Sequence, residues 1–166
     1  MNDRRIDDLL DAMTLEEQVS LLSGANFWCT TTIERLAIPS IKVTDGPNGA
    51  RGENFSGGIT SAAFPVAISL AASWDVDMVQ AVGVALAQEA KSKGAKVLLA
   101  PTVNMHRNVL NGRNFECFSE DPHLASEMAV AYISGVQSEG IAATVKHFIG
   151  NETEVERRTI SSEIDE

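Results

Sequence analysis

Apolar residues recur at helical spacing in three segments of the chain, and each segment opens with a helix-capping signal. Thr14-Leu15-Glu16-Glu17 has the form of a capping box, Asp75 precedes the second segment, and Asp121-Pro122 places an N-cap before a proline. Glycines close the segments at positions 24, 94 and 140. We therefore predict three helices, with buried faces formed by Leu15, Val19 and Leu22; Val79, Val82, Leu86 and Ala90; and Leu124, Met128, Ala131, Tyr132, Gly135 and Val136.

Three short apolar runs occupy residues 38–43, 96–100 and 141–145, and the last two each follow a predicted helix directly. Their apolar residues stand at consecutive positions, which is typical of strands buried on both faces of a parallel sheet. Pro39 interrupts the first run. Strands that alternate with helices indicate an α/β fold.

Polar, loop-forming residues follow each predicted strand. These loops are residues 44–49, 101–107 and 146–148. In an α/β barrel, functional groups lie on the loops after the carboxyl ends of the strands, and in an open doubly wound sheet they lie at a switch point on the same edge. The chain has no G-x-G-x-x-G or Walker loop, which argues against a nucleotide site.

The number of predicted strands is too small for a closed barrel. Three strand–helix units fill the chain as far as residue 146, whereas a barrel needs eight strands and about 250 residues. The chain is either a small open sheet or the N-terminal portion of a (β/α)8 barrel. Residues 151–166 are polar and predict no helix to cover the third strand, which favours the barrel portion. We expect a helical lead-in over 1–40 and an incomplete barrel domain over 41–166.

Composition and charge narrow the range of partners. Thirteen Lys plus Arg against 23 Asp plus Glu give a net charge of −10, which is unfavourable for binding nucleic acid. No apolar run approaches the roughly 20 residues of a membrane span, and the charged N-terminus does not resemble a secretory signal. With only Cys29 and Cys117 present, no disulfide framework is predicted. We expect a cytoplasmic protein without nucleic-acid or membrane partners.

Charged residues gather in the predicted strand-end loops. Arg107, Arg113, Lys146 and His147 lie there together with Glu116. One interpretation is a buried ion-pair network. The other is a clamp for a polyol, because Lys and Arg donate to hydroxyl groups and His donates or accepts. Lys146 at a strand end also admits a Schiff-base role.

Two other features admit both a structural and a functional interpretation. The loop from Asp45 to Gly49 is either a simple turn or a turn that holds Asp45 as a hydroxyl acceptor. Trp28 belongs to the core or stacks on a sugar, whereas its neighbour Phe27 is expected in the core. The histidine spacing matches no metal motif and there is no G-x-S-x-G elbow, so neither a metal site nor a serine nucleophile is expected.

Taken together, the motifs resemble the family 3 glycoside hydrolases, specifically their β-glucosidase branch. The stretches that carry the resemblance are residues 13–24, 34–39, 43–49, 99–107, 111–122 and 144–152. Their order and spacing match over nearly the whole chain. The resemblance implies the first part of a (β/α)8-type N-terminal domain, truncated after about three strands, and no cofactor.

The resemblance also implies roles for individual residues. Asp45, Arg113, Lys146 and His147 are expected to bind the hydroxyls of the non-reducing sugar, and Arg107 and Glu116 to support them from beneath. The expected partner is a small β-glucoside or oligosaccharide.

The family cleaves β-glycosides with retention, through an Asp nucleophile and a Glu acid/base that lie about 5–5.5 Å apart. The resemblance places the nucleophile in a Ser-Asp-Trp-like motif downstream of Glu166 and the acid/base in a later domain, so that this chain is a fragment that is inactive alone. Residues 146–152 lack the Lys-His-Phe-Pro-Gly motif of β-N-acetylglucosaminidases. The predicted parent activity is a β-glucosidase; the alternatives are a β-xylosidase or arabinofuranosidase, or an inactive sugar-binding remnant.

Overall fold

A computed structural model describes residues 3–53 and 57–165, and the side chains of the first helix from residue 5 onward. The chain forms two compact units, Met1–Val43 and Thr44–Glu166. The sequence predicts a boundary after residue 40, three residues earlier. None of the helices in the described ranges combines the length and the apolar character that crossing a membrane requires.

The first unit contains helices α1 (Asp3–Ala12) and α2 (Leu15–Leu21) and the short 3-10 helix η1 (Glu34–Leu36). The predicted capping box is confirmed: Thr14 Oγ1 accepts from the Glu17 amide at 3.3 Å, and Glu17 Oε2 accepts from the Thr14 amide at 2.9 Å. Arg35 pairs with the same Glu17 carboxylate, and this ties η1 to α2.

Two predictions about this unit are wrong. The apolar stripe of α2 is not buried, since Leu15, Val19 and Leu22 are 71%, 55% and 89% exposed, and Phe27 is 88% exposed instead of lying in the core. The reason is the small size of the unit. Among its described residues, the buried apolar side chains are Met13 and Ile33.

The second unit contains the two long helices that the sequence predicts. α4 spans Val76–Ser92 after its N-cap Asp75, and α5 spans Pro122–Ser138 after its N-cap Asp121. The cap carboxylates accept backbone amides at 2.9 Å (Met78) and 3.0 Å (His123), as expected for helix starts. A short helix that the sequence pattern did not predict, α3 (Ala67–Ala71), precedes α4.

The sheet has the order β1 (Val43–Asp45), β2 (Val97–Leu99) and β3 (Ala142–Ala143), and β2 and β3 are parallel, with Val97 opposite Ala142. The α/β prediction is therefore confirmed. The strand predicted over 38–43 is wrong in extent. Its earlier residues form antiparallel bridges, Ile38 with Ile33 and Lys42 with Cys29, so the chain joins the sheet at Val43.

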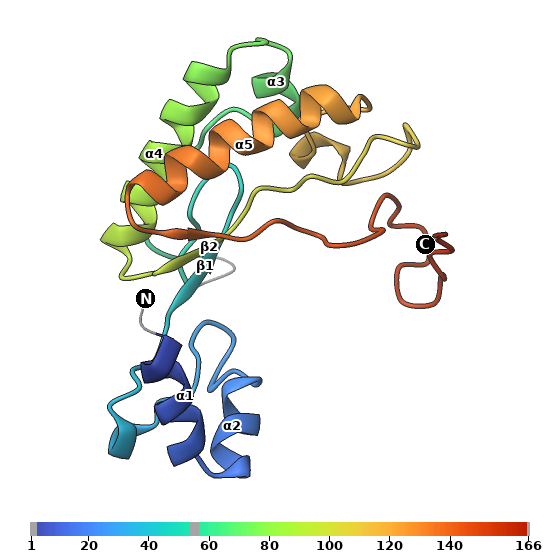
Figure 1. Cartoon of the computed structure of the whole chain (residues 1–166). Coiled ribbons are helices and arrows are strands. Elements are labelled where there is room, and N and C mark those ends of the chain that lie inside the picture. Colours follow the sequence, from blue (N-terminus) through green and yellow to red (C-terminus); the bar gives the residue numbers. More distant parts are fainter. Residues whose placement is uncertain (1–2, 54–56, 166) are drawn as a thin grey trace. The chain divides into compact units, whose positions relative to one another are not determined.

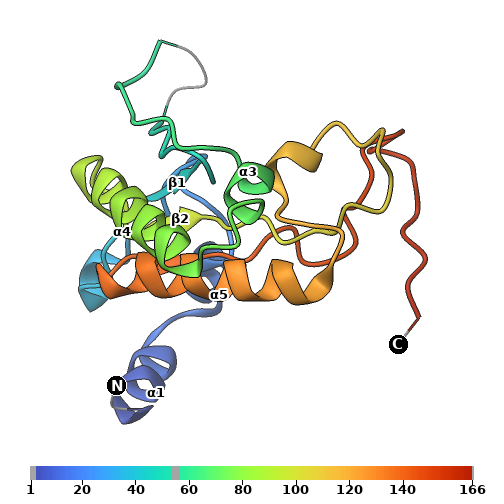
Figure 2. The ribbon, with the colours of Figure 1, turned by 90° about the horizontal axis from the view of Figure 1, so that it is seen from above.

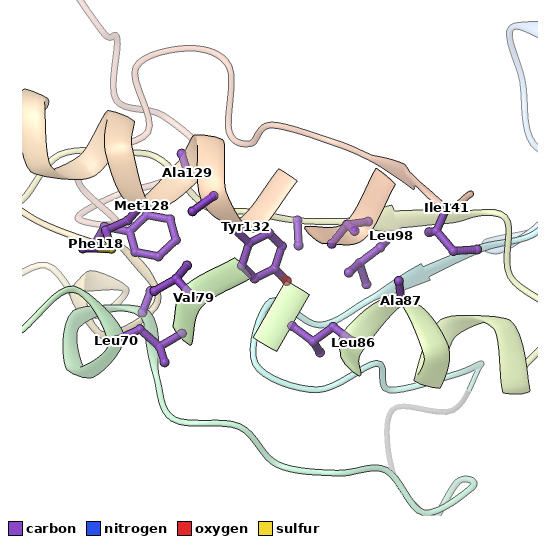
Figure 3. Packing of buried hydrophobic residues seen from close by; sticks show 14 of the residues in the cluster. Leu70, Val79, Leu86, Ala87, Leu98, Phe118, Met128, Ala129, Tyr132 and Ile141 are labelled. Atoms are coloured by element: carbon purple, nitrogen blue, oxygen red, sulfur yellow. The ribbon is translucent and has the colours of Figure 1, made fainter. Parts of the chain in front are cut away.

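α4 and α5 lie side by side against the sheet (Figure 1 and Figure 2) and enclose the main apolar cluster (Figure 3). Most of the predicted inner-face residues of both helices are buried there, and Val82 and Leu124 are partly buried. The fully buried members include Val79, Leu86, Ala90, Leu98, Met128, Tyr132 and Val136. The helix pair therefore covers one face of the sheet and supports the strands whose ends carry the polar loops.

Two glycines allow α4 and α5 to approach closely. A Cβ added at Gly83 would lie 2.5 Å from the Tyr132 carbonyl oxygen, and one added at Gly135 would lie 2.1 Å from the Gln80 carbonyl oxygen. Both obstacles are helix backbone, which cannot move away without separating the helices.

We predict that Gly135→Ala destabilises the protein. In an exposed helix this change stabilises by about 1 kcal/mol, but here overpacking costs about 1–3 kcal/mol or more. Gly112→Ala is the matched control, because no heavy atom lies within 4 Å of its added Cβ. Urea unfolding of both variants measures the difference, and an unchanged or raised stability of Gly135→Ala would contradict the close approach.

Candidate functional site

The carboxyl ends of the strands border a pocket of about 480 Å³. Residues that follow β1 form one wall, and residues from the loop before α5 and from the end of β3 form the rest. The lining residues are Asp45, Gly46, Pro47, Asn48, Gly49, Arg51, Ala62, Ala63, Val66, Arg113, Phe115, Glu116 and Lys146. A pocket at this edge of a parallel sheet is the usual ligand site of α/β folds.

Asp45 is the last residue of β1 and is held by a tight turn. The Gly49 amide donates to the Gly46 carbonyl at 3.2 Å, and the Arg51 amide donates to the Asp45 carbonyl at 3.0 Å. Gly46 has a φ of 121°, and a Cβ there would lie 1.9 Å from the Gly49 carbonyl oxygen. The segment is thus a turn that requires glycine, and the same turn presents the Asp45 carboxylate to the pocket.

Lys146, three residues after β3, contacts the residue that ends β1. Its Nζ donates to Asp45 Oδ1 at 2.6 Å, and Arg51 contributes a second cation 3.8 Å from Asp45 Oδ2. Burial acts to raise the pKa of Asp45, but the hydrogen bond and charge of Lys146 outweigh it and lower that pKa below its ordinary value. An ammonium held by a carboxylate is poorly suited to act as a Schiff-base amine, so the contact favours the polyol clamp.

Arg113 uses all three guanidinium nitrogens. Nε donates to the buried Glu116 carboxylate, NH1 lies 3.4 Å from Glu154 Oε1, and NH2 lies 3.0 Å from His147 Nε2. Glu116 also accepts a hydrogen bond from Thr102 Oγ1 at 2.9 Å. The guanidinium is therefore fixed in one orientation at the wall of the pocket.

His147 is oriented from two sides. A guanidinium only donates, so Nε2 accepts from Arg113, and Nδ1 carries the proton and donates to Asn104 Oδ1 at 3.2 Å. The same Asn104 oxygen accepts from the His147 amide at 2.8 Å. Burial first, then the nearby charges of Arg113 and Lys146, lower the pKa of His147, so the imidazole is neutral near pH 7.

The sequence analysis missed several of these partners, namely Arg51, Thr102, Asn104 and Glu154. Thr102 and Asn104 are both buried and alternate with Val103 after β2. Side chains two residues apart in an extended segment lie on the same side. This period of two within Pro101–Arg107 was the signal that could have identified them.

Of the candidates, His147 contacts the pocket residue Arg113 without lining the pocket itself, and Arg107 and Trp28 have other surroundings. Arg107 is exposed and lines a different pocket, with Asn108 and Gly150 among its neighbours. Trp28 belongs to the first unit and is half-buried there, and its carbonyl accepts from the Val43 amide at 2.8 Å. The supporting role of Arg107 and the stacking role of Trp28 stay predictions.

The pocket thus combines hydroxyl acceptors with hydroxyl donors. Asp45 faces Lys146, and Glu116 faces Arg113. Both carboxylates of the pocket wall are engaged by cations, which suits them to binding and not to nucleophilic or acid chemistry. Such a set of paired carboxylate, ammonium, guanidinium and imidazole groups at strand ends is what recognition of a polyol needs. The class defined by fold and site is an α/β domain with a polar pocket at the carboxyl ends of its strands.

Comparison with known proteins assigns the family. Residues 9–165 match the glycosyl hydrolase family 3 N-terminal domain, and the chain belongs to this family. It is 68% identical over 162 residues to a β-glucosidase of Rhizobium radiobacter and 53% identical over 162 residues to β-glucosidase B of Emericella nidulans. These alignments cover 97% and 98% of this chain but 20% and 19% of the relatives, so the chain spans about a fifth of their length.

A solved structure shows the same fold. The crystal structure of the β-glucosidase from Kluyveromyces marxianus in complex with glucose superimposes with a TM-score of 0.88 at 48% identity, over 90% of this chain and 18% of that one. The fold is therefore the N-terminal portion of the barrel domain of this family, as the sequence predicts.

We predict that Asp45→Asn lowers the free energy of unfolding at pH 7, by about 1–2 kcal/mol. Because the folded-state pKa of Asp45 lies below the ordinary value near 4, the stability it contributes is present above about pH 4 and is lost as the pH falls through the folded-state pKa. The difference from wild type should therefore shrink below pH 4. Urea unfolding at pH 7 and pH 3 measures it, with the exposed, mid-helix Glu127→Gln as control. A difference independent of pH would contradict the Lys146–Asp45 ion pair.

Proposed function

We propose that this chain supplies the sugar-binding half of a retaining β-glucosidase, an enzyme that removes terminal β-D-glucosyl residues from small glucosides. The observation that carries the proposal is that Asp45, Arg113 and Lys146, from three strand-end loops, line one pocket, with Lys146 in contact with Asp45 and His147 in contact with Arg113. The relatives named above are β-glucosidases, and the Kluyveromyces marxianus structure holds glucose. Both support a glucoside as the ligand.

Each side chain then has a defined part in binding. Asp45 accepts from a ring hydroxyl, and Lys146 and Arg113 donate. The Nε2 of the neutral His147 accepts from Arg113, so it binds a hydroxyl only by taking that hydroxyl in place of, or together with, the guanidinium. The sugar hydroxyls take the places of solvent around ions that are already paired. The pocket therefore needs no rearrangement of charge when the sugar enters.

The bond-breaking groups of the proposed enzyme lie outside this pocket wall. Retention uses two carboxyl groups about 5–5.5 Å apart, one as nucleophile and one as acid/base, and Asp45 and Glu116 are committed to Lys146 and Arg113. We propose that both catalytic carboxylates come from the portion of the enzyme that corresponds to the remaining length of the relatives. The residues here act by gripping the ring, and hydrogen bonds to hydroxyls strengthen as the ring distorts in the transition state.

We predict that Lys146→Ala, His147→Ala and Arg113→Ala each lower kcat/KM for a β-glucoside by on the order of 10²-fold, at about 1.4 kcal/mol per factor of ten. The measurement uses a chimera in which this chain replaces the matching 162 residues of the Rhizobium radiobacter β-glucosidase. A Schiff-base lysine would differ, because borohydride would then trap a covalent adduct that depends on Lys146.

Lys91→Ala provides the control for a lost ion pair, since Lys91 binds Glu139 at 2.8 Å between α4 and α5 and not at the pocket. Near wild-type kcat/KM for folded Lys146→Ala would contradict the sugar clamp. A chimera that prefers a β-xyloside would favour a xylosidase, and a folded chimera that turns over neither sugar would favour an inactive sugar-binding remnant.

We predict that the 166-residue chain alone does not hydrolyse nitrophenyl β-glucoside. The carboxylates of the pocket wall in the described residues are held by cations, so neither is available as nucleophile or acid. The active chimera serves as the positive control in the same assay. Release of nitrophenol by the pure chain, abolished by Lys146→Ala, would refute the division between binding and bond-breaking groups.

A further inference from the structure

The buried end of Tyr132 lies against the turn that carries Asp45. Its side chain projects from α5 into the apolar cluster (Figure 3), and the residue is 1% exposed. The hydroxyl donates to the Pro47 carbonyl at 3.0 Å, across 85 positions of the sequence. Pro47 lines the pocket and stands two residues after Asp45. A core side chain thus has a direct polar contact with the wall of the site.

The packing of the ring does not need this hydroxyl. The ring meets Phe118 edge-to-face, with centroids 6.5 Å apart, and the remaining neighbours in the cluster are apolar. A phenylalanine would make the same contacts, whereas a buried hydroxyl costs free energy unless it finds a partner. The hydroxyl is therefore explained by what it binds and not by the cluster around it.

The close packing of α4 against α5 holds the helix that carries the Tyr132 hydroxyl. Gly83 and Gly135 bring the backbones of α4 and α5 into close contact, and a Cβ at Gly83 would meet the Tyr132 carbonyl itself. At this point α5 cannot move relative to α4 without breaking the contact. The phenol is therefore held by the helix pair and not by the loop that it contacts.

Other contacts also hold the turn, among them the donation from Lys146 Nζ to Asp45 Oδ1 at 2.6 Å. Asn48 bonds residues 64 and 65, through its carbonyl to the Phe64 amide at 2.8 Å and through Nδ2 to the Pro65 carbonyl at 3.3 Å. The Gly52 amide donates to Thr44 Oγ1 at 3.1 Å. The contacts of Asn48 and Gly52 hold the turn to its own flanking segments, and Lys146 holds the side chain of Asp45. Tyr132 ties the turn to α5.

We propose that Tyr132 is a positioning residue for the sugar site, whose hydroxyl fixes the 45–49 turn and so sets the place of the Asp45 carboxylate. The inference rests on the proposed function, since Asp45 is taken as a hydroxyl acceptor. Burial, with the Asp45 charge nearby, raises the pKa of Tyr132, so the phenol stays protonated and remains a donor over the working pH range.

The test is Tyr132→Phe in the same chimera, combined with Asp45→Asn as a double-mutant cycle. Loss of one positioning hydrogen bond should lower kcat/KM for the β-glucoside by about 3- to 10-fold, while the same change in the Asp45→Asn background should alter it less than about 2-fold. Ser138→Ala is the matched control, because it removes from the same helix a hydroxyl that donates only to Gly135 at 2.7 Å, and it should leave kcat/KM unchanged.

Two results would overturn the proposal. One is kcat/KM for Tyr132→Phe within 2-fold of the parent. The other is an equal loss in both backgrounds, which would show a general structural role. A second readout does not depend on activity: amide hydrogen exchange of residues 44–52 should be faster in Tyr132→Phe than in Ser138→Ala, with exchange of α4 unchanged. If the parent chimera cleaves no glycoside, the proposed function fails, and this exchange measurement still decides whether Tyr132 holds the turn.

Discussion

The contact between Lys146 and Asp45 is the interaction on which the site depends. In the sheet order β1-β2-β3, the two residues follow or end the outer strands, and two strand spacings separate those strands by roughly 10 Å. Aspartate is too short to span that distance. Lys146 lies in the segment that continues from β3, and its extended side chain spans most of that distance to reach Asp45 at the end of β1.

The other charged side chains of the pocket wall are also paired with groups of opposite charge. A half-buried carboxylate or guanidinium is costly without a partner, and Arg113 meets this by contacting Glu116, Glu154 and His147 together. The result is a pocket of paired ions whose remaining lone pairs and N–H groups are available to hydroxyls. Under the proposed function, a neutral polyol adds hydrogen bonds to this pocket without separating any of these charges from its counter-ion.

Much of this arrangement could be predicted from the sequence, because local signals determine it. Asp75 and Asp121 carry strong capping signals, and the 3.6-residue period of the following segments identifies the buried faces of α4 and α5. The loops after the strands identified Asp45, Arg113, Lys146 and His147 as candidates, and the structure brings them together.

Contacts between residues far apart in the sequence were harder to predict. The run before Val43 is apolar like a strand, but it pairs antiparallel with residues 29 and 33, which no local pattern indicates. Glu154 was missed for the same reason, since its role arises from a contact with Arg113, 41 positions away.

The helix pair and the pocket are parts of one mechanical arrangement. Gly83 and Gly135 exist at the crossing of α4 and α5 because only a hydrogen atom fits there, and this close crossing is what carries the Tyr132 ring to its place beneath the sheet. From there one hydrogen bond reaches Pro47, and two residues earlier the chain presents Asp45 to Lys146. A packing constraint between two helices is thereby connected to the placement of a carboxylate in the pocket. A backbone shift of the helix pair would move the phenol relative to the turn, and the short contact between Asp45 and Lys146 leaves little room for such a shift. The close helix packing therefore serves the precision of the site as well as the stability of the fold.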